Sequence, residues 1–232
     1  MNYDALLDLL KERRSIRTFK PDLVSDEYVD KIIEAGRWAP SGFNQQPWEF
    51  VIVKDPGLKD GIVQICKAQG ELNAQMEATR ESWQKTVKAP SPTGPGGDYS
   101  VAPVFILILG DKRTRSGLPM IRRYDDRQWQ LVFISGLANA LLFMHLAATS
   151  LGLGGQWVSR VSTPYGNCMI KKLLGIPEPF EIYDMMVVGY SASPPQPRLM
   201  REKKKMVHYD YCGPGAFRTD EEVNDFIRRS RA

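Results

Sequence analysis

The sequence is short of the residues that hydrolytic and metal-dependent enzymes use. It holds two histidines, His145 and His208, among 232 residues, so a Ser-His-Asp triad or a histidine-rich metal site has little support. The patterns G-x-S-x-G and G-x-x-x-x-G-K-[ST] are missing. The glycine-rich stretch 152–155 fails G-x-G-x-x-G because Trp157 stands where the last glycine belongs. We therefore expect no metal site and chemistry that depends on a bound cofactor.

Cysteine is scarce as well, and this bears on the compartment. Cys66, Cys168 and Cys212 are far apart and form no C-x-x-C pair. This spacing argues against a disulfide framework or a zinc knuckle and favours a reducing environment. Residues 1–15 carry acidic side chains among their apolar positions and lack a small-residue cleavage site, so they do not resemble a secretory signal. We expect a cytoplasmic protein.

Neither sign of charge dominates. The 31 Lys and Arg stand against 27 Asp and Glu, and the formal net charge of +4 is too small to indicate nucleic acid as a partner. The longest apolar stretch, residues 131–153, has the length of a membrane span, but Ser, Asn, His and Thr interrupt it. We interpret it as a central helix that is apolar on all sides, with small residues suited to a dimer seam, and expect no membrane association.

Helical and strand patterns alternate along the chain. Helix caps and apolar spacing predict helices over residues 3–12, from Ser25 to Pro40, and over 165–174. Short apolar runs predict buried strands at 48–53, 104–109 and 185–188. With 43% hydrophobic residues the chain can bury one full core, which favours a single mixed α/β or α+β domain over residues 1–232. Lid-like insertions are expected at about 55–100 and 111–127, and a C-terminal extension from about 191.

The segment RRSIRTF brings three arginines and a hydroxyl together directly after a predicted helix. In an extended backbone Arg13, Ser15 and Arg17 share one face, with Arg14 between them. Guanidinium groups and a hydroxyl on one face suit a phosphate and its attached sugar chain. A solvated basic turn is the alternative, and these residues alone do not separate the two.

Two further segments have residues that could meet a planar ligand. In WAPSGFNQQPW, residues 38–48, the polar side chains Ser41, Asn44 and Gln46 offer donors and acceptors such as the edge of a flavin's pyrimidine ring requires. The alternative is an Asx-type turn with both flanking tryptophans in the core. In GLGGQWVSR, residues 152–160, glycine lets backbone N–H groups approach a ligand closely, and the alternative is a helix C-cap followed by a turn.

Taken in order, RRSIRTF, APSGFNQQPW, GLGGQW and LLGIPEPF before a strand ending in VGY resemble the nitroreductase family of FMN enzymes over about residues 8–208. The resemblance implies an α+β fold with a central, mostly antiparallel β-sheet flanked by helices. It also implies an intertwined homodimer with two FMN sites, each drawing on both subunits. NADH or NADPH would reduce the flavin, and a small organic acceptor such as a nitroaromatic or a quinone would then be reduced, in a ping-pong mechanism without a catalytic side chain.

The resemblance also assigns roles to residues. Arg13, Arg14 and Ser15 would hold the phosphate and ribityl chain, and Arg17 would lie near flavin N1 and O2, where a cation stabilises the reduced anion. The residues that match the segment reaching the partner's flavin are Pro40, Ser41, Gly42 and Asn44. Those matching the stretch that faces the ring and its N5 are Trp157, Val158, Ser159 and Arg160. In the tail, Arg201 is the preferred phosphate contact and Arg198 the second.

The sequence departs from the family pattern near Ser159 and Arg160, where many relatives have a small or acidic residue followed by glycine. A Ser159 hydroxyl bonded to flavin N5 would favour one-electron steps. RRSIR and STPYGNC also resemble the iodotyrosine deiodinase branch, so reductive dehalogenation of a halogenated aromatic substrate is an alternative. That branch grips its substrate with a Glu, a Tyr one helical turn later and a Lys, whereas here Glu71 is followed by Gln75. Two more hypotheses are flavin-cleaving chemistry and a non-catalytic flavin-binding protein.

Overall fold

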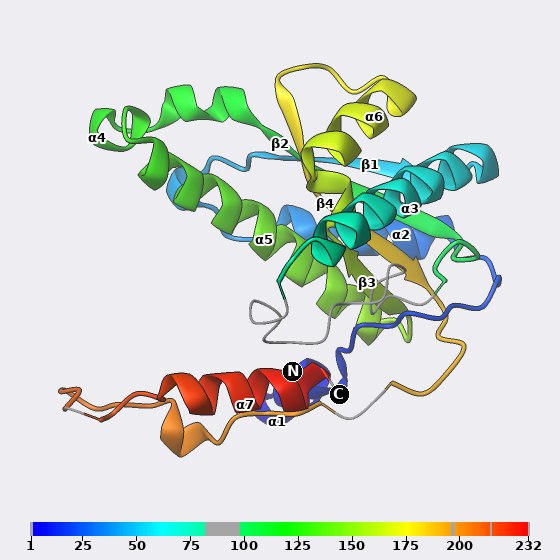
Figure 1. Cartoon of the computed structure of the whole chain (residues 1–232). Helices are drawn as coiled ribbons and strands as arrows, with labels where there is room; N and C mark the ends of the chain where they lie inside the picture. The colour runs from blue at the N-terminus through cyan, green and yellow to red at the C-terminus, as the bar shows by residue number, and fades with distance from the viewer. Residues whose placement is uncertain (1, 82–97, 196–197, 214, 232) are drawn as a thin grey trace.

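A four-stranded antiparallel sheet with helices on both faces forms the body of the protein in the computed structural model, which describes residues 2–81, 98–195, 198–213 and 215–231 (Figure 1). The strands follow the order β1-β2-β4-β3 across the sheet. Their bounds are β1 (Trp48–Val53), β2 (Val104–Asp111), β3 (Gly154–Val158) and β4 (Phe180–Gly189). The prediction of an α+β fold with a central antiparallel sheet is confirmed.

The helices begin and end close to the limits that capping residues predict. Ser25 accepts a hydrogen bond from the Tyr28 N–H at the start of α2, and Thr163 accepts one from the Gly166 N–H at the start of α6. Gly175 ends α6 in the left-handed conformation, with φ of 67°. The helices are α1 (Tyr3–Glu12), α2 (Asp26–Arg37), α3 (Pro56–Ala78), α4 (Met120–Arg123), α5 (Asp126–Ser150), α6 (Pro164–Leu174) and α7 (Asp220–Arg231).

Alternation along the strands divides the core into two layers. On β2, Val104, Ile106 and Ile108 point toward α2 and α5, and the intervening residues point toward α3 and α6. A bulge between Ile108 and Leu109 shifts the register against β4. The shift allows both Ile182 and Met185 to face the α3 and α6 layer although three positions separate them.

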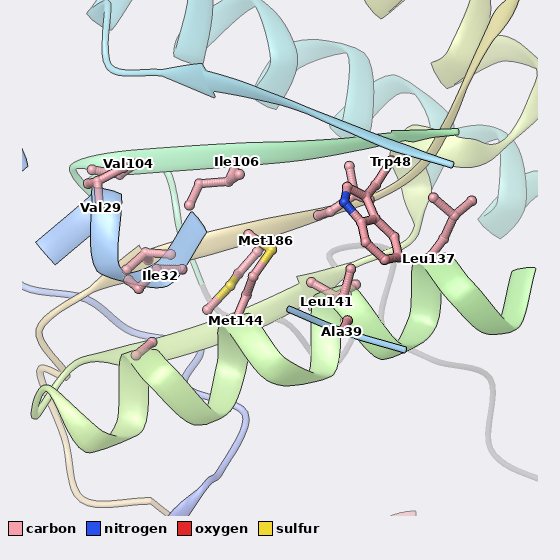
Figure 2. Close-up of a cluster of buried hydrophobic side chains, with 14 of the residues drawn as sticks. Val29, Ile32, Ala39, Trp48, Val104, Ile106, Leu137, Leu141, Met144 and Met186 are labelled. Carbon is pink, nitrogen blue, oxygen red and sulfur yellow. The ribbon is translucent and has the colours of Figure 1, made fainter. Parts of the chain in front are cut away.

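The long helix α5 is the centre of the first layer. Its apolar side, which includes Leu137, Leu141 and Met144, packs against the sheet and α2 (Figure 2). The helix begins five residues earlier than the apolar stretch because Asp125 caps it by accepting from the Gln128 N–H. Among the described residues α5 is the one helix long and apolar enough to cross a membrane. Its most apolar 18-residue window has a mean hydropathy of 1.9, and 44% of that window is buried inside the protein.

The two ends of the chain lie outside the sheet-and-helix body. In Figure 1 both α1 and α7 lie below it, and α1 has no buried residue. The C-terminal extension from about residue 191 leads to α7, which sequence patterns did not predict. Within the expected insertions, α3 fills the first part of 55–100, and a 3-10 helix (Lys112–Gly117) and α4 occupy most of 111–127. Residues 82–97, with most of the PSPTGPGGD run, lie outside the described residues.

Replacement of one core residue and of its register partner tests this arrangement. Ile106 on β2 pairs with Ile52 on β1, yet Ile106 is 0% exposed and Ile52 is 42% exposed. We expect Ile106→Ala to lower the free energy of unfolding by about 3 kcal/mol, and Ile52→Ala by about 1 kcal/mol or less. Urea denaturation of both variants measures the difference, and equal losses would contradict the burial of Ile106 between β1 and β4 and the exposure of Ile52 on the edge strand.

Candidate functional site

The arginine-rich segment is held in extended form against the edge of the sheet. The Ile16 N–H donates to the Gly155 carbonyl of β3 at 3.0 Å, and the Lys20 N–H donates to the Tyr190 carbonyl just after β4 at 2.9 Å. The buried side chains of Ile16 and Phe19 anchor the segment to the core. The residues between these anchors are therefore placed by backbone pairing, and their polar side chains face outward.

A pocket of about 400 Å³ lies over this segment. It joins the start of the chain to the connector after β4, and its lining residues are Arg13, Arg14, Ser15, Ile16, Arg17, Thr18, Ser191, Ser193, Pro194, Pro195 and Arg198. Thr18 and Ser193, from the two sides, are hydrogen-bonded through their hydroxyls at 2.8 Å. Four guanidinium groups and several hydroxyls therefore line one cavity.

No carboxylate of the described residues pairs with the arginines of this pocket. None of Arg13, Arg14, Arg17 and Arg198 forms an ion pair with another of the described residues. Burial lowers the pKa of Arg13, and the charges of Arg198 and Arg14 lower it further. An anion in the pocket would relieve this repulsion, and bidentate guanidinium groups with nearby hydroxyls fit a phosphate.

Of the two tail arginines predicted to contact the phosphate, one lines the pocket and the other does not. Arg198, the second choice from the sequence, lines the pocket. Arg201, the preferred one, is not among the lining residues, and its guanidinium donates to the Lys205 carbonyl at 3.3 Å. Ser191 and Ser193 were not singled out from the sequence, although they directly follow the VGY that ends the strand.

The strand β3 and the turn after it hold the second group of predicted residues. Val158 is buried in the layer with α3 and α6, whereas Trp157 points to the opposite face and is 38% exposed. The Trp157 indole N–H donates to the Asp184 carboxylate at 2.5 Å, and the Ser159 hydroxyl bonds the same carboxylate. Arg160 lies close enough to Cys66 for its charge to act on the thiol. Burial raises the pKa of Cys66, and the charge of Arg160 opposes this rise.

The loop of residues 40–46 is strained and lies on α5. Phe43, Asn44 and Gln46 have φ of 58°, 50° and 44°, which is costly for residues with a Cβ. The Ser41 hydroxyl accepts from the Gln46 N–H at 2.9 Å and so holds the loop in shape. Such strain is typical of ligand-binding segments, which makes the loop a functional candidate.

The loop is not brought to the arginine pocket of the same chain. The Asn139 side chain of α5 donates to the Pro40 carbonyl at 3.0 Å, and Gly42 lies so close to Val132 that a Cβ there would be 2.6 Å from its Cγ1. None of the loop residues lines the pocket. Of the flanking tryptophans Trp48 is buried and Trp38 is 71% exposed, so one of the two belongs to the core.

His145 on α5 lies beneath Trp157 and was assigned no role from the sequence. The two rings are stacked, with centroids 6.1 Å apart and an interplanar angle of 12°. Burial, with a smaller contribution from the charge of Arg13, lowers the His145 pKa to about 4. His145 is therefore neutral at physiological pH, and its buried Nε2 has no hydrogen-bond partner in the described part of the chain.

A second, more apolar cavity of about 700 Å³ opens beside this stack. Trp129, Phe133 and Ile134 of α5 form one side, and Tyr183 and Asp184 of β4 form the other. Ser159 and Ser162 also line it. No group of three or more His, Cys, Asp or Glu that could hold a metal ion is found among the described residues.

The fold and the site together define a class of protein, namely an α+β protein with a pocket lined by arginines that no carboxylate of the described residues pairs with. Residues 10–190 match the family model described as the nitroreductase family, and the chain belongs to that family. It is 30% identical over 194 residues to iodotyrosine deiodinase 1 of Rattus norvegicus, a match that covers 82% of this chain and 63% of the relative. The chain therefore spans less than two thirds of that relative's length.

Solved structures show the same fold. A nitroreductase with bound FMN from Bacteroides fragilis is 21% identical, with a TM-score of 0.63, over 91% of this chain and 100% of that one. A BluB-like flavoprotein from Clostridium difficile is 24% identical, with a TM-score of 0.68, over 89% of this chain and 99% of that one. At these identities the similarity concerns the fold.

The lowered pKa of His145 predicts a loss of stability in acid. An unfolded histidine takes up its proton near pH 6.5, whereas the folded one does so near pH 4, so protons favour unfolding as the pH falls between these values. We expect this group to lower the free energy of unfolding by about 3 kcal/mol between about pH 7 and pH 4.

The variant His145→Phe keeps a ring against Trp157 and removes the titrating group. Urea denaturation at a series of pH values should therefore show a shallower acid dependence for this variant than for the unmodified protein. Parallel curves for the two proteins would contradict a buried, neutral His145.

Proposed function

We propose that this chain is an FMN-dependent oxidoreductase that uses NADH or NADPH to reduce a small organic acceptor, and that it acts as a homodimer. The observation that carries the proposal is the pocket in which Arg13, Arg14, Arg17 and Arg198 converge without a carboxylate among the described residues. A phosphate monoester such as that of FMN carries negative charge and acceptor oxygen atoms, which would pair with the arginines of this pocket.

The chain's own residues would bind and orient the cofactor. Arg13, Arg14 and Arg198 would neutralise the phosphate, and the Ser15 hydroxyl would donate to it or to the sugar chain, whereas the Ser191 hydroxyl already donates to the Ser193 carbonyl at 2.5 Å. Trp157 would offer an apolar surface to the ring system, and Arg17 would place a positive charge near its polar edge. Bound FMN would supply the transfer of electrons between the nicotinamide donor and the acceptor.

The homodimer accounts for two features of the single chain. The strained loop of residues 40–46 lies away from the arginine pocket of its own chain, so it would contribute to a cofactor site only in a second copy. Large apolar side chains are exposed on α1, α5 and the tail, and a second copy would cover them. These residues are Leu6, Leu10, Leu131, Ile134, Leu142, Tyr209, Tyr211 and Phe217.

Reductive dehalogenation of an aromatic substrate is the second candidate, because the rat relative at 30% identity is named iodotyrosine deiodinase 1. Glu71 and Gln75 lie one turn apart on α3, and both are exposed, so their side chains are available to a ligand. The deiodinase branch has a tyrosine one turn after the glutamate, and here Gln75 stands in its place, so the phenol group is missing. We therefore rank nitroaromatic and quinone reduction first.

Anaerobic spectroscopy tests the activity itself. We expect protein loaded with FMN to lose its visible flavin absorbance when NADH or NADPH is added, and to regain it when a nitroaromatic or quinone follows. Regain of the absorbance with a halogenated tyrosine, together with released halide, would favour the dehalogenase instead. A flavin that no nicotinamide donor reduces would contradict an NAD(P)H oxidoreductase and favour a carrier.

A matched pair of tail variants tests the phosphate site. We expect Arg198→Gln to weaken FMN binding by about tenfold or more, because it removes a charged hydrogen-bond donor from the pocket. Arg201→Gln, which changes a residue outside the lining, should alter the Kd by less than about twofold. Quenching of FMN fluorescence on titration gives both constants. The reverse order would show that the tail holds the phosphate in another conformation.

A further inference from the structure

Asp184 is a buried carboxylate in the middle of the sheet. It is 6% exposed, and it lies on β4 two residues before Met186, on the side of the sheet that α5 covers. It stands at the register shift between β2 and β4. A carboxylate at such a place is costly unless other groups satisfy it, and sequence patterns did not mark it.

Polar side chains meet this carboxylate, and no cation of the described residues pairs with it. The Trp157 indole N–H donates at 2.5 Å, and the Ser159 hydroxyl acts on the carboxylate as a hydrogen-bonding group that lowers its pKa. The Ser162 hydroxyl is 3.5 Å from the carboxylate and donates at 2.8 Å to the Ser159 carbonyl. Asp184 has no salt-bridge partner among the described residues. Burial raises its pKa, and the three side chains oppose that rise. These side chains come from β3 and the turn after it, so the carboxylate ties this segment to β4.

The bond to Trp157 sets the orientation of the indole. One face of the ring is stacked on His145, and the ring of Tyr183 meets it edge-on with centroids 6.2 Å apart. With its N–H held by Asp184 the ring cannot rotate away from His145 without losing a charge-assisted hydrogen bond. The indole still remains 38% exposed, so it is a fixed apolar surface that is open to a ligand.

The bond to Ser159 sets the direction of a hydroxyl. A serine hydroxyl has one proton and two lone pairs. When that proton donates to the Asp184 carboxylate, the hydroxyl offers only lone pairs to anything else that lies beside it. It would therefore accept from a ligand N–H and would not donate to an unprotonated ligand nitrogen.

We propose that Asp184 is a positioning residue of the flavin site, which fixes the Trp157 indole as a stacking surface and turns the Ser159 hydroxyl into an acceptor. This inference rests on the proposed function, because it assigns Trp157 and Ser159 to the cofactor. Asp184 itself acts through these two side chains. Its effect on binding therefore depends on both being present.

A double-mutant cycle on FMN affinity separates this role from a structural one. The four proteins are the unmodified chain, Asp184→Leu, the double variant Trp157→Phe with Ser159→Ala, and the triple variant. We expect Asp184→Leu to weaken FMN binding by about tenfold in the unmodified background, because the indole and the hydroxyl lose their common anchor. In the double variant the same change should matter by less than about twofold, since the residues it acts through are gone.

Two further measurements keep the test decisive. Ser150→Ala, which removes an exposed hydroxyl at the end of α5, serves as the matched control and should leave both affinity and the near-ultraviolet tryptophan circular dichroism unchanged. In the flavin-free protein Asp184→Leu should weaken that tryptophan signal. If Asp184→Leu does not fold, Asp184→Asn replaces it, with a smaller loss that should again vanish in the double background.

The outcomes distinguish the two proposals. An equal loss of affinity in both backgrounds would mean that Asp184 supports the fold in general, and would overturn the positioning role alone. An unmodified protein that binds no FMN would overturn the proposed function, and the positioning role with it.

Discussion

The gathering of arginine charges in one pocket is the constraint on which the site depends, since Arg198 and Arg14 repel Arg13 and Arg17 lines the same cavity. The segment after α1 pairs with β3 through the Ile16 N–H and the Gly155 carbonyl, so its backbone is fixed at the edge of the sheet. The connector after β4 adds Arg198 from the other end of the chain. Burial first, and then the charges of Arg198 and Arg14, lower the pKa of Arg13, and a bound phosphate would favour its charged form.

A buried carboxylate is the second polar feature of the site. Asp184 lies behind Trp157 and has hydrogen bonds in place of a cation, while His145 is neutral beneath the same indole. The pocket and this cluster are joined through β3, whose Gly155 pairs with Ser15 and whose Trp157 reaches Asp184. The site therefore has a charged part suited to a phosphate and a flat apolar part suited to a ring.

Much of the fold follows from local patterns. Ser25, Thr163 and Gly175 mark helix ends in the sequence because each satisfies or ends a backbone hydrogen-bond series within a few residues. The apolar run at 48–53 coincides with β1, and the arginines at 13–17 are extended as their spacing suggests. The helix α7 was not predicted, because a charged amphipathic segment has the same pattern whether it is a solvated tail or a packed helix.

The sequence by itself determined most of the helices and strands, the order of the four motifs and the residue types that could meet a phosphate and a flavin, because these depend on neighbours within one or two turns. Only the tertiary structure decided that Arg198 and not Arg201 lines the pocket, that Asp184 holds Trp157 and Ser159, and that the loop at 40–46 lies apart from the arginines of its own chain. Those relations join residues far apart in the chain, and they follow from strand order and register, which no local pattern specifies.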